Sequence, residues 1–205
     1  MKIKCTLFCL LILFSGKVAA QTKIRLDNPS FEEPNRAPGQ TPSFWINLGE
    51  ATATPPDIQP GYFGVKEVPH HGRAYLGLVV RENNTWEGVG QVLDGILRKD
   101  SSYTFSLSLN RSNTYLSPTM LCSEPAKFNN PTILKIWGYN TKTKQEELLA
   151  ESQPVSHSKW VDYEFVLKPT LGDYDELDLM AYYAPGFEQT NGNLLIDDCS
   201  AIVKK

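Results

Sequence analysis

Residues 103–110 run Tyr103-Thr104-Phe105-Ser106-Leu107-Ser108-Leu109-Asn110, and apolar and polar side chains alternate along the whole stretch. Successive side chains of a β-strand point to opposite faces, so this pattern predicts a strand with one buried face. The same alternation recurs at 161–167 and 177–183. Further strands are expected at 23–26, 44–48, 63–67, 74–80, 87–93, 132–139 and 194–203.

Turn signals separate these strands, the clearest being Pro60-Gly61, Pro185-Gly186 and Asn191-Gly192. Many short strands, without the helices that parallel strands need between them, predict an all-β chain. We expect an antiparallel β-sandwich of jelly-roll type. Residues 144–151 form a helix-like stretch, and a short strand is the alternative there.

Residues 1–20 have the pattern of a secretory signal peptide. Lys2 and Lys4 precede an apolar run, and Val18-Ala19-Ala20 offers small residues for cleavage. The apolar run is too short for a spanning helix. The sequence therefore predicts an exported protein, periplasmic, outer-membrane-associated or extracellular, whose residues 21–205 form a single binding domain.

Removing this leader changes the charge balance. Three lysines and no acidic residue are lost, so 17 basic residues face 23 acidic ones and the net charge falls from −3 to −6. A mildly acidic chain without a basic cluster is a poor candidate for binding nucleic acid. No later apolar run is long enough for a membrane span, and we expect a monomer.

Two of the four cysteines, Cys122 and Cys199, remain after cleavage. Export places them in a compartment that permits disulfides. A bridge between them and two separate buried thiols are both compatible with the sequence, because spacing alone does not bring two Cα atoms within reach.

Three segments carry a family resemblance: Asn28-Pro29-Ser30-Phe31-Glu32, Tyr75-Leu76-Gly77-Leu78-Val79 and Ile196-Asp197-Asp198. Their order resembles the galactose-binding-like jelly rolls, which include many carbohydrate-binding modules. With the segment from Thr54 to Gly61, the chain is most similar to a set of secreted proteins of gliding-type bacteria. The resemblance covers nearly all of residues 24–203 and implies the same fold.

The resemblance also implies a structural calcium ion. In such jelly rolls a Glu of the first motif and an Asp of the last often meet at calcium, and here Glu32 with Asp197 or Asp198 would take those roles. Neighbouring strand residues face opposite sides, so at least one of the two aspartates meets apolar neighbours, which is costly without a partner. Hydrogen bonds to loop backbone, with no ion, are the alternative.

Candidate ligand-binding residues are aromatic and polar side chains away from the expected core. Sugars are recognised by flat aromatic rings together with a few placed polar groups. Trp86 opens a strand after a polar turn, Tyr115 lies in a long loop, and Trp137 is out of phase with Leu134 and Ile136. The polar candidates beside them are Arg81, Arg111 and Asp57. Ordinary core packing is the alternative for each aromatic residue.

No catalytic motif stands out. The chain lacks a Gly-x-Ser-x-Gly elbow and a phosphate loop, and nothing marks the acid pairs Glu82 with Glu87 or Asp57 with Glu67 as catalytic. We therefore predict a non-catalytic module that binds carbohydrate. The alternative is a surface or periplasmic module that binds another protein, and a glycan-active enzyme is the less favoured third reading.

Overall fold

The structure, a computed structural model, describes residues 22–49, 55–118 and 124–205. The predicted signal peptide and Cys122 lie outside these ranges. Every regular element in the described part is a β-strand, and no helix there could cross a membrane. All pairings between the named strands are antiparallel.

Two large sheets form the molecule. The first has seven strands: β1 (Lys23–Ile24), β14 (Ile202–Lys204), β6 (Tyr103–Asn110), β13 (Gly192–Asp197), β4 (Tyr75–Val80) and β3 (Asp57–Gln59), with β11 (Val161–Leu167) paired to β6. The second has five strands: β10 (Glu146–Glu151), β9 (Thr132–Tyr139), β12 (Tyr174–Tyr183), β5 (Gly88–Leu97) and β2 (Ile46–Asn47).

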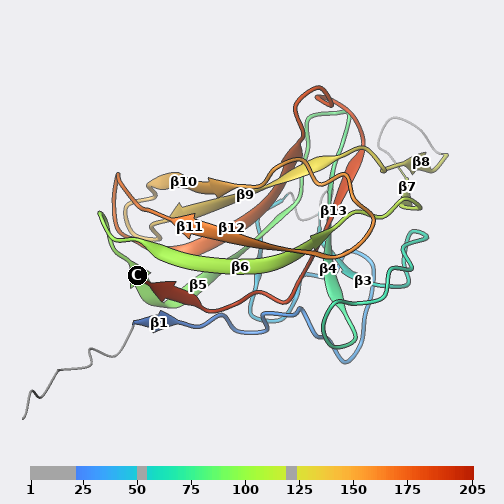
Figure 1. Ribbon diagram of the computed structural model, residues 1–205. Helices are drawn as coiled ribbons and strands as arrows, with labels where there is room; N and C mark the ends of the chain where they lie inside the picture. Colours follow the sequence, from blue (N-terminus) through green and yellow to red (C-terminus); the bar gives the residue numbers. More distant parts are fainter. Residues whose placement is uncertain (1–21, 50–54, 119–123) are drawn as a thin grey trace, which may run out of the picture.

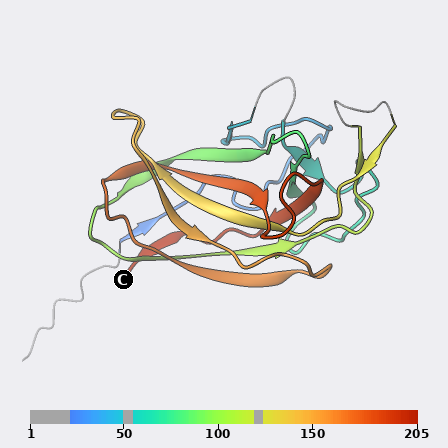
Figure 2. The ribbon, with the colours of Figure 1, turned by 90° about the horizontal axis from the view of Figure 1, so that it is seen from above.

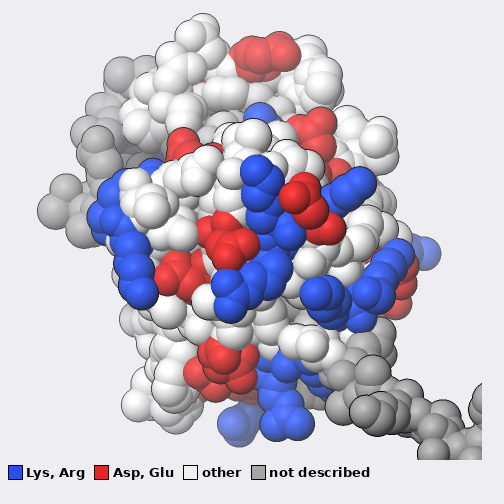
Figure 3. Space-filling view, turned by 90° about the vertical axis from the view of Figure 1, so that its left-hand side faces the viewer, with Lys and Arg blue, Asp and Glu red and all other residues white. Residues whose placement is uncertain are grey.

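The long strands of both sheets run along the same general direction, as Figure 1 and the view from above in Figure 2 show. A small sheet of β7 (Leu116–Ser117) and β8 (Ala126–Lys127) lies at the end opposite the C terminus. On the face near the C terminus, basic and acidic side chains are interspersed rather than gathered by sign (Figure 3).

The main core contains residues from both sheets. Phe105 and Leu107 of β6, Leu177 and Leu179 of β12 and Ile136 of β9 are all fully buried in it. Burial of this apolar surface is the main force that holds two sheets together. The predicted antiparallel sandwich is confirmed.

Residues 132–139, 161–167 and 103–110 form strands with the predicted bounds. The helix-like stretch belongs to β10, because the chain turns sharply before it and Lys144 has a φ of 62°. The strand alternative was therefore right there.

Two strand predictions were wrong. Residues 63–67 form a turn and loop, since Phe63 and Gly64 both have left-handed φ values, 54° and 78°. The expected strand 194–203 is divided into β13 and β14 by Asp198, whose φ is 51°. Its neighbour Cys199 donates its N–H to the carbonyl of Pro29 instead of continuing the strand.

Candidate functional site

The outer face of the five-stranded sheet carries an unusual set of side chains. In β12, Leu177 and Leu179 are fully buried against the other sheet. Strand alternation therefore directs Asp178, Met180 and Tyr182 to the outer face. This phase was visible in the sequence, but the acidic and aromatic residues on it were not selected as site candidates.

Strand register brings Trp137 to this group. Asp178 is directly opposite Trp137 of β9 on one side and Gly90 of β5 on the other. Two residues earlier in β12, on the same face, Glu176 is opposite Tyr139. Directly paired side chains on one sheet face lie close enough to interact. Two aromatic residues of β9 therefore line up beside two acidic residues of β12.

Tyr139, Glu176 and Asp178 border a hollow of about 340 Å³, which we call the sheet groove. Its lining residues come from β9, β10, β12 and the position after β2: Leu48, Tyr139, Glu146, Glu176, Asp178 and Met180. Gly90 lies beneath the two carboxyl groups. A Cβ atom there would stand 2.5 Å from Asp178 Oδ1 and 3.1 Å from Glu176 Oε1, so the glycine makes room for both.

Two polar atoms beside the groove have no partner among the described residues. Asp178 is only 8% exposed, and no N–H or O–H group of the described residues donates to its Oδ1. Its carboxyl group hydrogen-bonds to that of Glu176 when one of the two holds a proton. The buried Trp137 Nε1 donates no hydrogen bond. A buried polar atom without a partner is costly and calls for an explanation, such as a ligand or ordered water. Burial, and then the charge of Glu176, raises the pKa of Asp178 to about 8.

Aromatic rings continue the same face beyond the groove. Trp86 stacks on Tyr182 with 5.0 Å between ring centroids and 29° between planes. The Nζ atom of Lys135 lies 4.3 Å from the centre of the Tyr182 ring. Trp86 is partly buried and also packs against the main core, so the binding and packing interpretations of this residue both have support.

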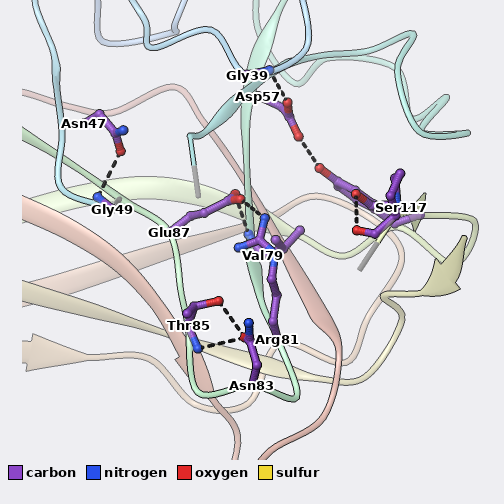
Figure 4. A network of polar contacts seen from close by, with 12 residues as sticks. Gly39, Asn47, Gly49, Asp57, Val79, Arg81, Asn83, Thr85, Glu87 and Ser117 are labelled. Carbon is purple, nitrogen blue, oxygen red and sulfur yellow. Dashed lines mark hydrogen bonds and ion pairs between the residues drawn. The ribbon is translucent and has the colours of Figure 1, made fainter. Parts of the chain in front are cut away.

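Three other predicted residues meet elsewhere. Asp57, Arg81 and Tyr115 line a second hollow, of about 390 Å³, whose apolar wall includes Phe63 and Val79. We call it the buried-acid hollow. Tyr115 is 1% exposed, and its hydroxyl donates to Asp57 Oδ2 at 2.5 Å, while Gly39 N donates to Oδ1 at 2.7 Å (Figure 4).

Glu87 completes this network. Arg81 Nη2 donates to Glu87 Oε1 at 2.5 Å, and Val79 N donates to Oε2 at 3.0 Å (Figure 4). Burial raises the pKa of Glu87 to about 8, and Arg81 opposes this effect. Burial also raises the pKa of Asp57. Each carboxylate oxygen has a donor, whereas Arg81 Nη1 has no partner in the described residues.

The structure does not bring the six predicted ligand residues together. Trp86 and Trp137 belong to the face of the sheet groove, and Asp57, Arg81 and Tyr115 to the buried-acid hollow. Arg111 lines neither of them. Its guanidinium donates to the carbonyls of Ser156, at 3.1 and 3.3 Å, and of Asn129. These contacts tie loops together, so a single site containing all six residues is excluded.

The predicted metal ligands lie around the segment that precedes β4. Glu32 Oε1 accepts the N–H groups of Arg73, at 2.7 Å, and Ala74, at 2.9 Å. Asp197, fully buried, accepts the N–H of His71 at 2.8 Å. The two carboxylates thus converge on one segment, as a shared ion would require. Backbone N–H groups also supply hydrogen bonds to both carboxylates without an ion. The described residues contain no cluster of three or more acidic, His or Cys side chains that could hold a metal ion.

Asp198 contacts the same segment through a different residue. Its Oδ2 lies 3.7 Å from His70 Nδ1, and its side chain is about half exposed. The left-handed φ at Asp198 ends the strand and turns the side chain out of the alternation assumed from the sequence.

No protein-family model matches the chain, and no curated protein matches it by sequence. Solved structures do match it in fold. The Stig cyclase Fisc from Fischerella sp. TAU superposes with a TM-score of 0.57 at 14% identity, covering 91% of this chain and 98% of the cyclase chain. The CBM22-1 xylan-binding domain of Paenibacillus barcinonensis Xyn10C gives 0.54 at 17% identity, covering 91% and 97%.

At these identities the likeness shows the fold alone. The chain has the jelly-roll sandwich that the carbohydrate-binding modules share, as its motifs predicted. Because a cyclase shares the same fold, function has to be argued from the residues of each site.

Proposed function

We propose that the chain is an exported, non-catalytic carbohydrate-binding module whose ligand lies in the sheet groove. The observation that carries this proposal is the pairing of Trp137 with Asp178 on the outer sheet face. Trp137 Nε1 is a buried donor without a partner in the described residues, and the neighbouring Asp178 carboxyl is a buried acid whose Oδ1 receives no N–H or O–H from them. A sugar hydroxyl both donates and accepts hydrogen bonds, so it can satisfy both.

The aromatic rings support the same ligand class. Tyr139 lines the groove, Trp137 lies beside it in the register, and the Trp86–Tyr182 stack continues the face. Apolar ring faces pack against the C–H faces of a sugar, while a few polar groups fix its orientation. Strands hold these side chains, so little ordering is needed on binding.

The test is a glycan array followed by calorimetry with the Trp137→Ala variant. We expect wild-type binding to at least one glycan and about a tenfold loss in the variant, the effect of removing a well-placed aromatic contact. Trp160→Ala is the matched control, because Trp160 packs against Tyr75 of the other sheet. If Trp137→Ala bound the glycan with unchanged affinity, the sheet groove would not be the binding site.

Acid–base chemistry in the buried-acid hollow is the second candidate function. The observation that favours it is the pair of buried carboxyl groups, Asp57 and Glu87, with raised pKa values. Such shifts are common among catalytic groups. One solved structure of similar fold is an enzyme, the Stig cyclase Fisc. Glycan turnover lost in Asp57→Asn but kept in Trp137→Ala would favour this candidate.

We propose the structural calcium ion separately from the glycan site. Glu32 and Asp197 would hold it, and it would fix the N-terminal motif to the end of β13. Calcium should then raise the melting temperature, by an amount set by its concentration relative to Kd, and chelation should lower it. Glu32→Gln should remove this response. A melting temperature that calcium and a chelator both leave unchanged would refute the ion.

A further inference from the structure

The sheet groove is acidic. Three of its six lining residues, Glu146, Glu176 and Asp178, carry carboxyl groups, and none of the six is basic. The inference below rests on the proposed binding of glycans in this groove. It concerns which glycans the groove accepts.

The two carboxyl groups of β12 affect each other's ionisation. Asp178 and Glu176 share the outer face of one strand, and both side chains are largely buried. Burial raises the pKa of both groups, and the charge of Glu176 raises that of Asp178 further, to about 8, so the pair holds a proton at neutral pH. Charges in such surroundings are screened less than at an open surface, so a further negative charge beside Glu176 would be costly.

Two lysines lie near the groove without lining it. Lys135 Nζ is placed over the Tyr182 ring, and Lys144 Nζ lies 5.7 Å from the centre of the Tyr139 ring. Lys144 partly offsets the raised pKa of Glu176. Lys135 is opposite Glu151 in the strand register, next to a further acid. The carboxyl groups therefore dominate the groove itself.

Hydrogen bonding also favours a neutral ligand. No N–H or O–H group of the described residues donates to Asp178 Oδ1. A sugar hydroxyl both donates and accepts, so it can bond to the carboxyl pair in either protonation state, whereas a ligand carboxylate only accepts. A uronic acid placed there would add a like charge beside Glu176.

We propose that the sheet groove binds uncharged glycan chains and rejects chains that carry carboxylate groups, with Glu176 and Asp178 as the residues that discriminate. Specificity of this kind comes from a repulsive element built against the wrong ligand as well as from contacts to the right one.

The experiment compares matched ligands by calorimetry. The neutral probes are cellohexaose, β-1,4-mannohexaose and xylohexaose. The charged probes are the first two chains with their primary hydroxyls oxidised to carboxylates, and the xylose chain with one glucuronic acid branch. We expect at least tenfold weaker binding of the charged member of whichever pair binds.

The double variant Glu176→Gln/Asp178→Asn should reduce this ratio to about threefold or less, since it removes both carboxyl groups and the negative charge that they carry while keeping similar shapes. The matched control Glu164→Gln/Glu188→Gln also removes two carboxyl groups, at exposed positions on β11 and in the turn after β12, and should keep the full ratio.

Two outcomes overturn the inference while leaving the proposed function intact: equal wild-type binding of both members of a pair, or an unchanged ratio in the double variant. If wild type binds none of the six probes and nothing on the glycan array, the proposed function fails, and this inference fails with it.

Discussion

The sheet groove and the buried-acid hollow both contain two carboxyl groups with raised pKa values, but they differ in how those groups are satisfied. In the hollow, every oxygen of Asp57 and Glu87 accepts a hydrogen bond from the protein. In the groove, Asp178 Oδ1 has no donor among the described residues.

This difference separates two uses of a buried acid. A fully satisfied network specifies the local structure, whereas an unpaired atom beside an open groove is available to a ligand. Arg81 Nη1 is the exception in the hollow, and it is the atom through which a small ligand could still be held there.

Glu87→Ala should have the largest effect. It leaves the Arg81 guanidinium buried without its partner, and breaking a buried ion pair in this way costs about 3–5 kcal/mol. Urea unfolding measures the change. Glu164→Ala, at an exposed position of β11, should change stability by less than about 0.5 kcal/mol. A loss below about 1 kcal/mol in Glu87→Ala would show that the network does not hold the structure together.

Asp178→Asn should change how stability depends on pH. The pKa of the Asp178 carboxyl is about 8 in the folded chain and near 3.9 in an unfolded one. Between these values the folded state holds the extra proton, so this group makes the protein less stable as pH rises from about 4 to about 8. The variant should lose that contribution, which linkage limits to about 5 kcal/mol across the window.

Thermal or urea unfolding at several pH values would show the difference between the variant and wild type. Asp173 offers a control of opposite sign, because hydrogen bonds from Lys99 N and Arg98 lower its pKa. Because the folded state lowers the pKa of Asp173, the stability that its ionised form contributes is lost as pH falls through the acid range. Parallel pH profiles for wild type and Asp178→Asn would contradict the assigned environment of Asp178.

Trp86→Ala should have the smallest effect of the series. Its ring is stacked on Tyr182 and packs partly on the core, which leaves less of it for a ligand than Trp137 offers. We expect about a two- to threefold loss of glycan affinity, in line with a contact outside the centre of a site. A loss larger than that of Trp137→Ala would move the centre of the site towards Trp86.

Much of the fold followed from local patterns. Alternation in residues 103–110 and 161–167 specified strands because a sandwich buries one face of each strand and exposes the other. Phe63 and Asp198 were misassigned for a common reason. Both adopt left-handed φ values that ordinary residues rarely take, and tertiary contacts hold them there.

The site was predicted only in part. Trp137 was selected correctly as an outward-facing residue, because its phase against Ile136 is a local property. Tyr115 was misleading, since a residue of a long loop is expected to be exposed and this one is buried by a ring stack with Phe63 and a hydrogen bond to Asp57. Glu176 and Asp178 looked like ordinary acids on an exposed strand face.

The class of fold and the faces of the longest strands can be predicted from the sequence, because the two-residue period of a strand is a local property. The row of Trp137, Asp178 and Gly90 across three strands, and the contact of Asp57 with Tyr115, arise only in the folded chain. Those meetings depend on the register between segments distant in the chain, where a shift of one residue would send each side chain to the opposite face.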